Sequence, residues 1–169
     1  AFAGEPFVFC PLTFDISAAK QFLKMIEPGM IPQPGTHIGD AVRLALEKLP
    51  EGGRNNVIVL LTDGEDHRSG PMEAAEEAKK MGVRIFAIGI GNPDGEPIPV
   101  KDAGGNVTGY RKNKKGEVVL SRLGESDLAQ MSLATGGSYF RASESEHELD
   151  LLADKLSEVE KDISTRKST

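Results

Sequence analysis

The sequence has one cysteine, no tryptophan and few aromatic residues, and it lacks any long run of apolar residues. Because Cys10 is alone, an internal disulfide is excluded. No apolar stretch approaches the roughly 18 residues that a membrane-spanning helix needs, and no basic segment followed by an apolar one opens the chain as in a signal peptide. We therefore expect the chain as given to be soluble.

Positive charge is also scarce, with 20 basic residues against 26 acidic ones and a formal net charge of −6. The basic residues form no stripe interleaved with aromatic side chains that could stack on bases, which argues against nucleic acid as a partner. A chain of 169 residues is long enough for one core. We expect a single domain over residues 1–163, followed by a polar tail over residues 164–169.

The apolar run at residues 57–61, Val-Ile-Val-Leu-Leu, is the stretch around which we expect the chain to fold. It lies between an Asn pair and an acidic glycine turn, which is typical of a strand buried on both faces of a parallel sheet. A helix opened by Pro71 and a second apolar run at residues 83–90 follow. The order strand, helix, strand implies a parallel crossover, so the predicted fold class is α/β.

Further elements are predicted on both sides of this unit from apolar periodicity and from capping residues. They are a strand at residues 7–10, helices at residues 15–27 and 36–49 with Asp15 and Thr36 as N-caps, a helix capped by Ser126, a strand at residues 138–142, and a final helix with the apolar stripe Leu149, Leu152, Leu156, Val159 and Ile163.

Residues 97–120 have a different pattern, with short β-prone pieces separated by glycine-containing turns. We expect a β-meander inserted on the α/β frame. Its second turn carries a basic cluster, which is either a solvated hairpin tip or a docking site for an acidic partner. The cluster consists of Arg111, Lys112, Lys114 and Lys115.

Three carboxylates, Asp63, Glu65 and Asp66, follow the first apolar run. Ligands of open α/β sheets bind beyond the carboxyl ends of the strands, so Asp63 occupies a position where such folds have their binding and active sites. The alternative is that Asp63 belongs only to a turn. Glu65 and Asp66 are either a second cation site or ordinary surface carboxylates, and His37 is either a ligand or a loop residue.

Four segments together resemble the von Willebrand factor type A domain, and more narrowly its bacterial aerotolerance-operon (Bat) branch. The segments are Pro34-Gly35-Thr36-His37-Ile38-Gly39-Asp40, Leu60-Leu61-Thr62-Asp63-Gly64-Glu65-Asp66, Ile88-Gly89-Ile90-Gly91 and Thr135-Gly136-Gly137-Ser138-Tyr139-Phe140, and the insert Gly95-Glu96-Pro97-Ile98-Pro99-Val100 is shared with the Bat branch. The resemblance implies a doubly wound, mostly parallel, Rossmann-like sheet.

The resemblance also implies a divalent cation, usually Mg²⁺, at the metal-ion-dependent adhesion site of the family. Thr36 matches the threonine ligand of that site and Asp63 matches the later aspartate. The third part of the motif, Asp-x-Ser-x-Ser, is absent. A hydroxyl and one carboxylate do not make a tight Mg²⁺ site, so we expect weak or no binding by this chain and Mg²⁺ binding in the complete domain.

The resemblance further implies that the first strand and first helix of the family fold are absent here, and that the missing strand would lie beside residues 57–61. Unpaired backbone groups in a central strand cost about 1–3 kcal/mol each. We therefore expect the gap to be filled by a separate N-terminal segment, by a strand-swapped second copy, or by collapse of the two half-sheets.

The function implied is a non-enzymatic module that binds an acidic residue of another protein. By resemblance it would be the periplasmic domain of a protein anchored in the bacterial inner membrane and associated with a MoxR-type ATPase system and with tolerance of oxygen or other stress. The alternative is a Mg²⁺-dependent phosphoryl-transfer enzyme or receiver domain, which also places an aspartate at a strand end.

Overall fold

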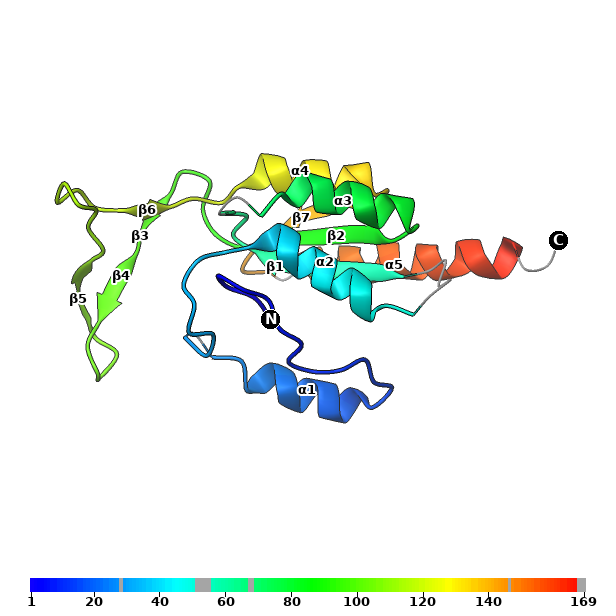
Figure 1. Ribbon diagram of the computed structural model, residues 1–169, viewed down its shortest axis with the longest axis horizontal. Helices are drawn as coiled ribbons and strands as arrows, with labels where there is room; N and C mark the ends of the chain where they lie inside the picture. The colour runs from blue at the N-terminus through cyan, green and yellow to red at the C-terminus, as the bar shows by residue number, and fades with distance from the viewer. Residues whose placement is uncertain (28, 51–55, 67–68, 146, 167–169) are drawn as a thin grey trace.

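The computed structural model describes residues 1–27, 29–50, 56–66, 69–145 and 147–166, with side chains as far as residue 161 (Figure 1). Five helices and seven strands are formed in this part of the chain. The helices are α1 (Ile16–Lys24), α2 (Ile38–Lys48), α3 (Pro71–Lys80), α4 (Glu125–Ala134) and α5 (His147–Arg166). The strands are β1 (Val57–Thr62), β2 (Arg84–Gly89), β3 (Glu96–Pro97), β4 (Pro99–Lys101), β5 (Val107–Tyr110), β6 (Leu120–Ser121) and β7 (Tyr139–Arg141).

The main sheet is parallel, with the strand order β1-β2-β7. Val57 pairs with Arg84 at one end of the β1–β2 ladder and Thr62 with Gly89 at the other, so both strands end at the same rim. α3 connects β1 to β2, as the strand-helix-strand pattern predicts. The predicted α/β fold with a mostly parallel sheet is confirmed.

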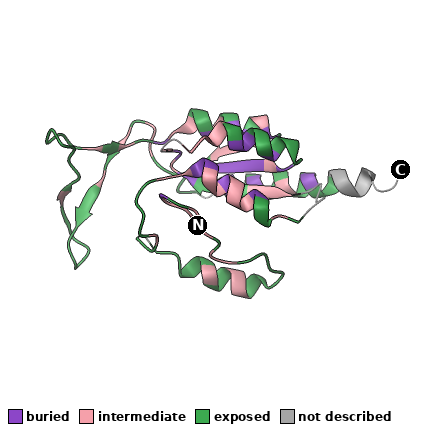
Figure 2. Cartoon of the chain, viewed as in Figure 1, coloured by how far each residue is buried: buried purple, intermediate pink, exposed green. Residues whose placement is uncertain are grey.

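Helices cover both faces of this sheet (Figure 1). On one face, apolar side chains of α2, α3 and α4 pack on Leu60, Ile85 and Ala87. On the other face, Leu152 and Val159 of α5 pack on Phe86 and Ile88 of β2. The buried residues are therefore concentrated in β2 and in the helix faces turned toward it, as Figure 2 shows. The apolar stripe predicted for the last helix is confirmed at Leu152 and Val159, whereas Leu149 is 47% exposed.

β1 is not buried on both faces, so the prediction for residues 57–61 is wrong for Val59 and Leu61. Leu60 is 5% exposed, whereas Val59 is 38% and Leu61 54% exposed on the opposite face. The reason is the position of β1 in the sheet. Among the described residues, β1 pairs only with β2, and α5 packs over β2 and β7.

The N-terminal region forms α1 but not the strand predicted at residues 7–10. Asp15 is the N-cap of α1, as predicted, and its Oδ1 accepts the N–H of Ala18 at 2.9 Å. The two phenylalanines of the expected strand instead make edge-to-face contacts, Phe7 with Phe9 and Phe9 with Phe22 of α1. No residue of α1 is buried.

The insert forms an arm, defined here as residues 97–120, that projects from the end of the sheet (Figure 1). β3 pairs with β6 at its base and β4 pairs with β5 further out, both antiparallel. An isolated bridge between Lys112 and Val118 closes the second turn. The predicted β-meander is confirmed.

The C-terminal helix is longer than predicted, because α5 continues to Arg166 through the first half of the expected polar tail. The remaining tail residues, 167–169, lie outside the described residues. None of the helices described is long and apolar enough to cross a membrane.

Candidate functional site

The candidate site is the loop that leaves the carboxyl end of β1. Asp63 is the first residue after the strand, and its Oδ1 accepts the N–H of Glu65 at 3.1 Å. The Asp63 carbonyl accepts the N–H of Gly124, just before α4, at 2.8 Å. Gly64 has a φ of +77°, which favours glycine, and a Cβ there would lie 2.8 Å from the Gly124 carbonyl oxygen. Close backbone contact with Gly124 thus fixes the conformation of the loop at Asp63 and Gly64.

The same loop caps the N-terminus of α2. The Oδ1 of Asp66 accepts the N–H of Ile38 at 2.9 Å, and the hydroxyl oxygen of Ser69 accepts the N–H of Gly39 at 2.7 Å. These are two of the backbone donors that a helix leaves unsatisfied at its start. Gly39 has no side chain to separate the two segments, and a Cβ at this position would lie 2.3 Å from the Ser69 carbonyl oxygen.

This arrangement corrects the prediction that Thr36 caps the second helix. The N-cap residue of α2 is His37, and its side chain makes no capping hydrogen bond. Asp66 and Ser69, about thirty residues further along the chain, provide the acceptors instead. A similar correction applies to α4, whose N-cap is Gly124 and not Ser126.

Arg43 of α2 makes a second connection to the loop. Its Nη1 donates to the Ser69 carbonyl at 2.8 Å, and its Nη2 donates to the Gly70 carbonyl at 3.3 Å. Its Nε donates to Glu77 of α3 at 3.1 Å. One planar guanidinium therefore joins α2, the end of the loop and α3.

The Asp66 carboxylate is held in its ionised form by these contacts. Partial burial raises the pKa of Asp66, but hydrogen bonds from the Ser69 side chain and from the backbones of Ser69 and Ile38 outweigh it and leave the pKa below its ordinary value. The other carboxylate of the loop, Glu65, accepts the N–H of Arg122 at 3.0 Å. Both carboxylates connect loops, a role that neither hypothesis for them had included.

Thr36 and Asp63 belong to segments that meet at this rim. Thr36 stands two residues before α2, whose first amide is bound by Asp66, three residues after Asp63. Their role as cation ligands stays a prediction. His37 pairs with Asp40, with 3.3 Å between Nδ1 and Oδ2.

The donor set at this rim fits Mg²⁺ in kind but not in number. A hydroxyl and a carboxylate are oxygen donors, which Mg²⁺ prefers, but two of them leave most of an octahedral shell to water or to another molecule. Within the described residues, no group of three or more His, Cys, Asp or Glu side chains could hold a metal ion.

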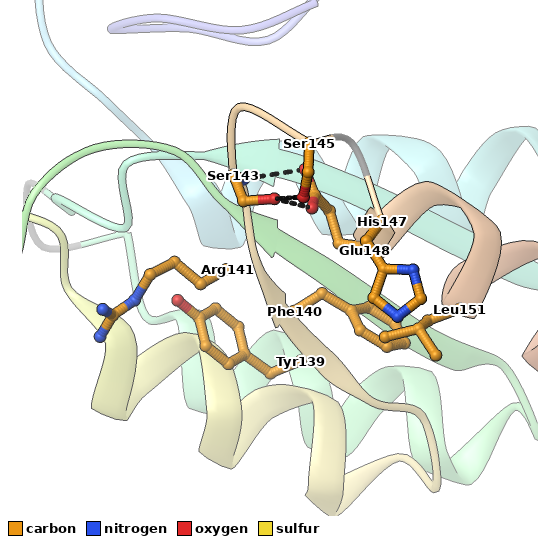
Figure 3. A pocket seen from close by; sticks show the side chains of 8 residues that line it. All are labelled: Tyr139, Phe140, Arg141, Ser143, Ser145, His147, Glu148 and Leu151. Atoms are coloured by element: carbon orange, nitrogen blue, oxygen red, sulfur yellow. Dashed lines mark hydrogen bonds between the residues drawn. The ribbon is translucent and has the colours of Figure 1, made fainter.

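A second polar cluster lies at the end of β7 and the start of α5, around a shallow hollow of about 380 Å³ (Figure 3). The Glu148 carboxylate accepts both the N–H and the hydroxyl of Ser143, at 2.9 and 2.7 Å. These hydrogen bonds lower the pKa of Glu148. The Ser143 hydroxyl thus connects the segment after β7 to the Glu148 side chain of α5.

On the other side of β7, Arg141 and Tyr139 share one acceptor. Arg141 forms a two-point ion pair with Glu125 of α4, and the Tyr139 hydroxyl donates to Glu125 Oε1 at 2.8 Å. The hydrogen bonds from Arg141 and Tyr139 lower the pKa of Glu125. This cluster fixes α4 against the sheet, and sequence patterns gave no sign of it because its members are 14 and 16 residues apart.

Comparisons with known proteins show the family and the fold of the chain. The sequence model of the von Willebrand factor type A domain matches residues 1–104. The crystal structure of a conserved hypothetical protein, BatB, from Bacteroides thetaiotaomicron superposes with a TM-score of 0.85 and a sequence identity of 35%. The match covers 95% of this chain and 77% of that one. An aerotolerance-related membrane protein from Bacteroides fragilis is 33% identical with a TM-score of 0.83, over 93% of this chain and 76% of that one.

Among curated proteins, Matrilin-1 of Gallus gallus is 29% identical over 144 residues. The match covers 70% of this chain and 28% of Matrilin-1, so the chain spans little more than a quarter of that relative. The family of these proteins consists in general of adhesion and protein-interaction modules, and those of its members with a complete adhesion-site motif bind a divalent metal. The chain belongs to the von Willebrand factor type A domain family, in its bacterial aerotolerance (Bat) branch.

Proposed function

We propose that this chain is a non-enzymatic protein-binding module whose ligand site is the rim at the carboxyl end of β1. In the complete domain, the Thr36 hydroxyl and the Asp63 carboxylate would hold a Mg²⁺ ion, and an acidic residue of a partner protein would bind there. The observation that supports this proposal is the capping of α2 by Asp66, because it ties the segment after Asp63 to the segment after Thr36.

The residues of this chain would prepare the rim for a carboxylate ligand. Asp66 and Ser69 keep the loop against α2, and Arg43 secures the far end of the same loop. A bound cation would supply positive charge for a partner carboxylate, and α2 points its positive N-terminal end toward the same rim. Neither role requires a chemical step.

The alternative is a Mg²⁺-dependent phosphoryl-transfer enzyme or receiver domain. Such a site would need further carboxylates beside Asp63 and a lysine opposite. The residues that follow β2 are Ile90, Gly91 and Asn92, and β7 is followed by Ala142 and Ser143. These positions at the neighbouring strand ends therefore supply neither a carboxylate nor a lysine. Metal-dependent phosphatase activity of the purified chain would favour this alternative.

The proposal for the cation can be tested even if binding is weak. Mn²⁺ takes the same oxygen ligands as Mg²⁺ and broadens the NMR signals of nearby nuclei, so it reports sites of low affinity. We expect selective broadening of the amides of His37 and Gly64, and its loss in Asp63→Asn. Asp94→Asn, which removes a carboxylate beyond the end of β2, serves as the matched control. Broadening that is unchanged in Asp63→Asn, or that spares both amides, would refute the site.

We further propose that the open edge of β1 accepts a strand, either from an N-terminal segment or from a swapped second copy. Support comes from the backbone edge that β1 leaves unpaired among the described residues and from the exposed side chains of Val59 and Leu61 beside it. By family resemblance, the whole protein would be anchored in the inner membrane with this domain in the periplasm, and would work with a MoxR-type ATPase system.

A further inference from the structure

Charge is unevenly divided between the arm and the rest of the chain. The arm, residues 97–120, contains five basic and two acidic residues, a net charge of +3. The other residues therefore carry a net charge of −9, which together with the +3 of the arm gives the total of −6. Four of the five basic residues lie within five positions at the second turn, at Arg111, Lys112, Lys114 and Lys115. We call these four residues the basic tip.

The charges of the basic tip are not neutralised by ion pairs within the part of the chain that the structure describes. All four side chains are exposed, and none takes part in an ion pair recorded among the described residues. The nearest acidic residue along the chain, Glu117, accepts a hydrogen bond from the Asn113 side chain at 2.9 Å. The basic tip is thus available to an external acidic group.

The turn that carries the basic tip has a defined conformation. Asn113 Oδ1 accepts the N–H groups of Lys115 and Glu117 at 2.9 and 3.0 Å, and Gly116 takes the left-handed conformation with a φ of +83°. The backbone of Arg111 bonds to both flanking segments, donating to Ile98 and accepting from Val119, at 2.8 Å each. A partner that binds here would not have to order the turn, which lowers the entropic cost of binding.

Exposed apolar side chains lie on β5, which precedes the basic tip, and just beyond its turn. Val107 and Tyr110 of β5 are 55% and 50% exposed, and Val118 beyond the turn is 44% exposed. The strands of the arm bury none of their residues. The arm therefore offers both charge and apolar contact area, as protein-binding surfaces do.

The base of the arm is fastened to the loop of the candidate site. The N–H of Arg122 donates to Glu65 Oε1 at 3.0 Å, and the N–H of Gly124 donates to the Asp63 carbonyl at 2.8 Å. Leu123 between them donates to the Asn92 carbonyl, which follows β2. The chain thus leaves the arm directly beside Asp63, so the arm and the rim lie next to each other.

We propose that the arm and the rim form one surface for an extended, acidic segment of a protein partner. This inference rests on the proposed function: one carboxylate of the segment would bind at the Thr36–Asp63 rim, and further carboxylates would contact the basic tip. Lys115 of the basic tip is seven positions from Arg122, which is bonded to the loop of the candidate site. Seven residues correspond to roughly 23 Å of extended chain. An extended partner segment of similar length reaches from one to the other.

The test uses this chain and synthetic peptides at low salt. The probe is a fluorescent peptide of alternating Glu and Ser residues, compared with the same peptide containing Gln in place of Glu. At about 0.01 M salt, where charges act over about 30 Å, we expect the Glu peptide to bind at least about tenfold more tightly. About 1 M salt, which reduces this distance to about 3 Å, should abolish the difference.

Two charge-matched variants locate the binding. Lys114→Glu with Lys115→Glu reverses two charges of the basic tip, and should weaken binding of the Glu peptide by about fivefold or more. Lys79→Glu with Lys80→Glu reverses an exposed adjacent pair on α3 and should change it by less than about twofold. Equal affinity for the Glu and Gln peptides, or equal losses in the two variants, would overturn the proposal.

Two further experiments separate this inference from its alternatives. Arm-dependent binding to vesicles containing phosphatidylglycerol, without binding of the Glu peptide, would overturn it in favour of a lipid surface. Asp63→Asn should leave the salt-sensitive binding at the basic tip largely intact, because that contact needs no cation. A failed Mn²⁺ experiment therefore refutes the cation site alone, and equal behaviour of the two lysine variants refutes the arm alone.

Discussion

Asp66 caps a helix that begins 28 positions earlier in the chain, through a hydrogen bond of 2.9 Å from the N–H of Ile38 to its Oδ1. Ile38 is 1% exposed, so no solvent could replace this acceptor without a rearrangement of the helix start. The same carboxylate accepts the N–H and the hydroxyl of Ser69, which in turn caps Gly39. One side chain therefore determines how the loop after β1 lies on α2.

Replacing Asp66 by Ala should destabilise the fold by about 1–2 kcal/mol, because the amides of Ile38 and Ser69 both lose their acceptor. Urea unfolding followed by circular dichroism measures this change. The control is Glu47→Ala, which removes an exposed carboxylate from the same α2 and should change the stability by no more than about 0.5 kcal/mol. Equal effects of the two substitutions would mean that the cap contributes nothing.

The contribution of Asp66 should also depend on pH. Its pKa is lower in the folded protein than in the unfolded chain, because hydrogen bonds to Ser69 and Ile38 favour the charged form. The stabilisation is therefore complete above the unfolded pKa of about 3.9 and is lost as the pH falls through the folded pKa. The difference in unfolding free energy between the wild type and Asp66→Asn should be constant near neutral pH and shrink in this acid range. A difference independent of pH would show that the charge of Asp66 is not involved.

Two adjacent leucines of β1 should respond very differently to truncation. Leu60 is 5% exposed in the core beneath α2 and α3, so Leu60→Ala should cost about 2–4 kcal/mol. Leu61 is 54% exposed on the opposite face, and Leu61→Ala should cost less than about 1 kcal/mol. Urea unfolding of the two variants under the same conditions makes the comparison. A similar cost for both would indicate that a second copy covers this face in solution.

Local signals in the sequence predicted many of these elements, because their causes are local. Asp15 caps α1 through an amide three positions away, and Pro71 opens α3. A continuous apolar run likewise located β2, and apolar periodicity located α5. Whether an apolar strand is covered on both faces depends on its neighbours in the sheet, which is why the exposure of Val59 and Leu61 could not be predicted from an apolar run.

The candidate site was accessible from the sequence only in part. Asp63 stands at a strand end, and family resemblance pointed to Thr36, but the side chains that hold their loops carry no comparable signal. Arg43 contacts Gly70 and Glu77, 27 and 34 positions away. Such contacts depend on how the strand and helices pack. An arginine inside an amphipathic helix resembles any other polar residue on its exposed face.

The hydroxyl of Tyr139 should ionise only at an unusually high pH. Burial and the hydrogen bond that its hydroxyl donates to Glu125 raise the pKa of Tyr139 to about 12, from an ordinary value of about 10. Because the folded pKa is the higher one, the stabilisation from this group is complete below about pH 10 and is lost as the pH rises toward 12. The chain has two tyrosines, so phenolate absorbance of Tyr110→Phe reports Tyr139 alone.

In this background, Glu125→Gln should lower the midpoint of the Tyr139 titration only in part, because burial is the larger cause and remains. The matched control, Asp127→Asn, removes a carboxylate two positions away on α4 and should leave the midpoint unchanged. Circular dichroism at each pH establishes that the protein is still folded. A midpoint near 10 in the folded Tyr110→Phe protein would mean that the Tyr139 hydroxyl is exposed to water and that its contact with Glu125 does not hold α4 on the sheet.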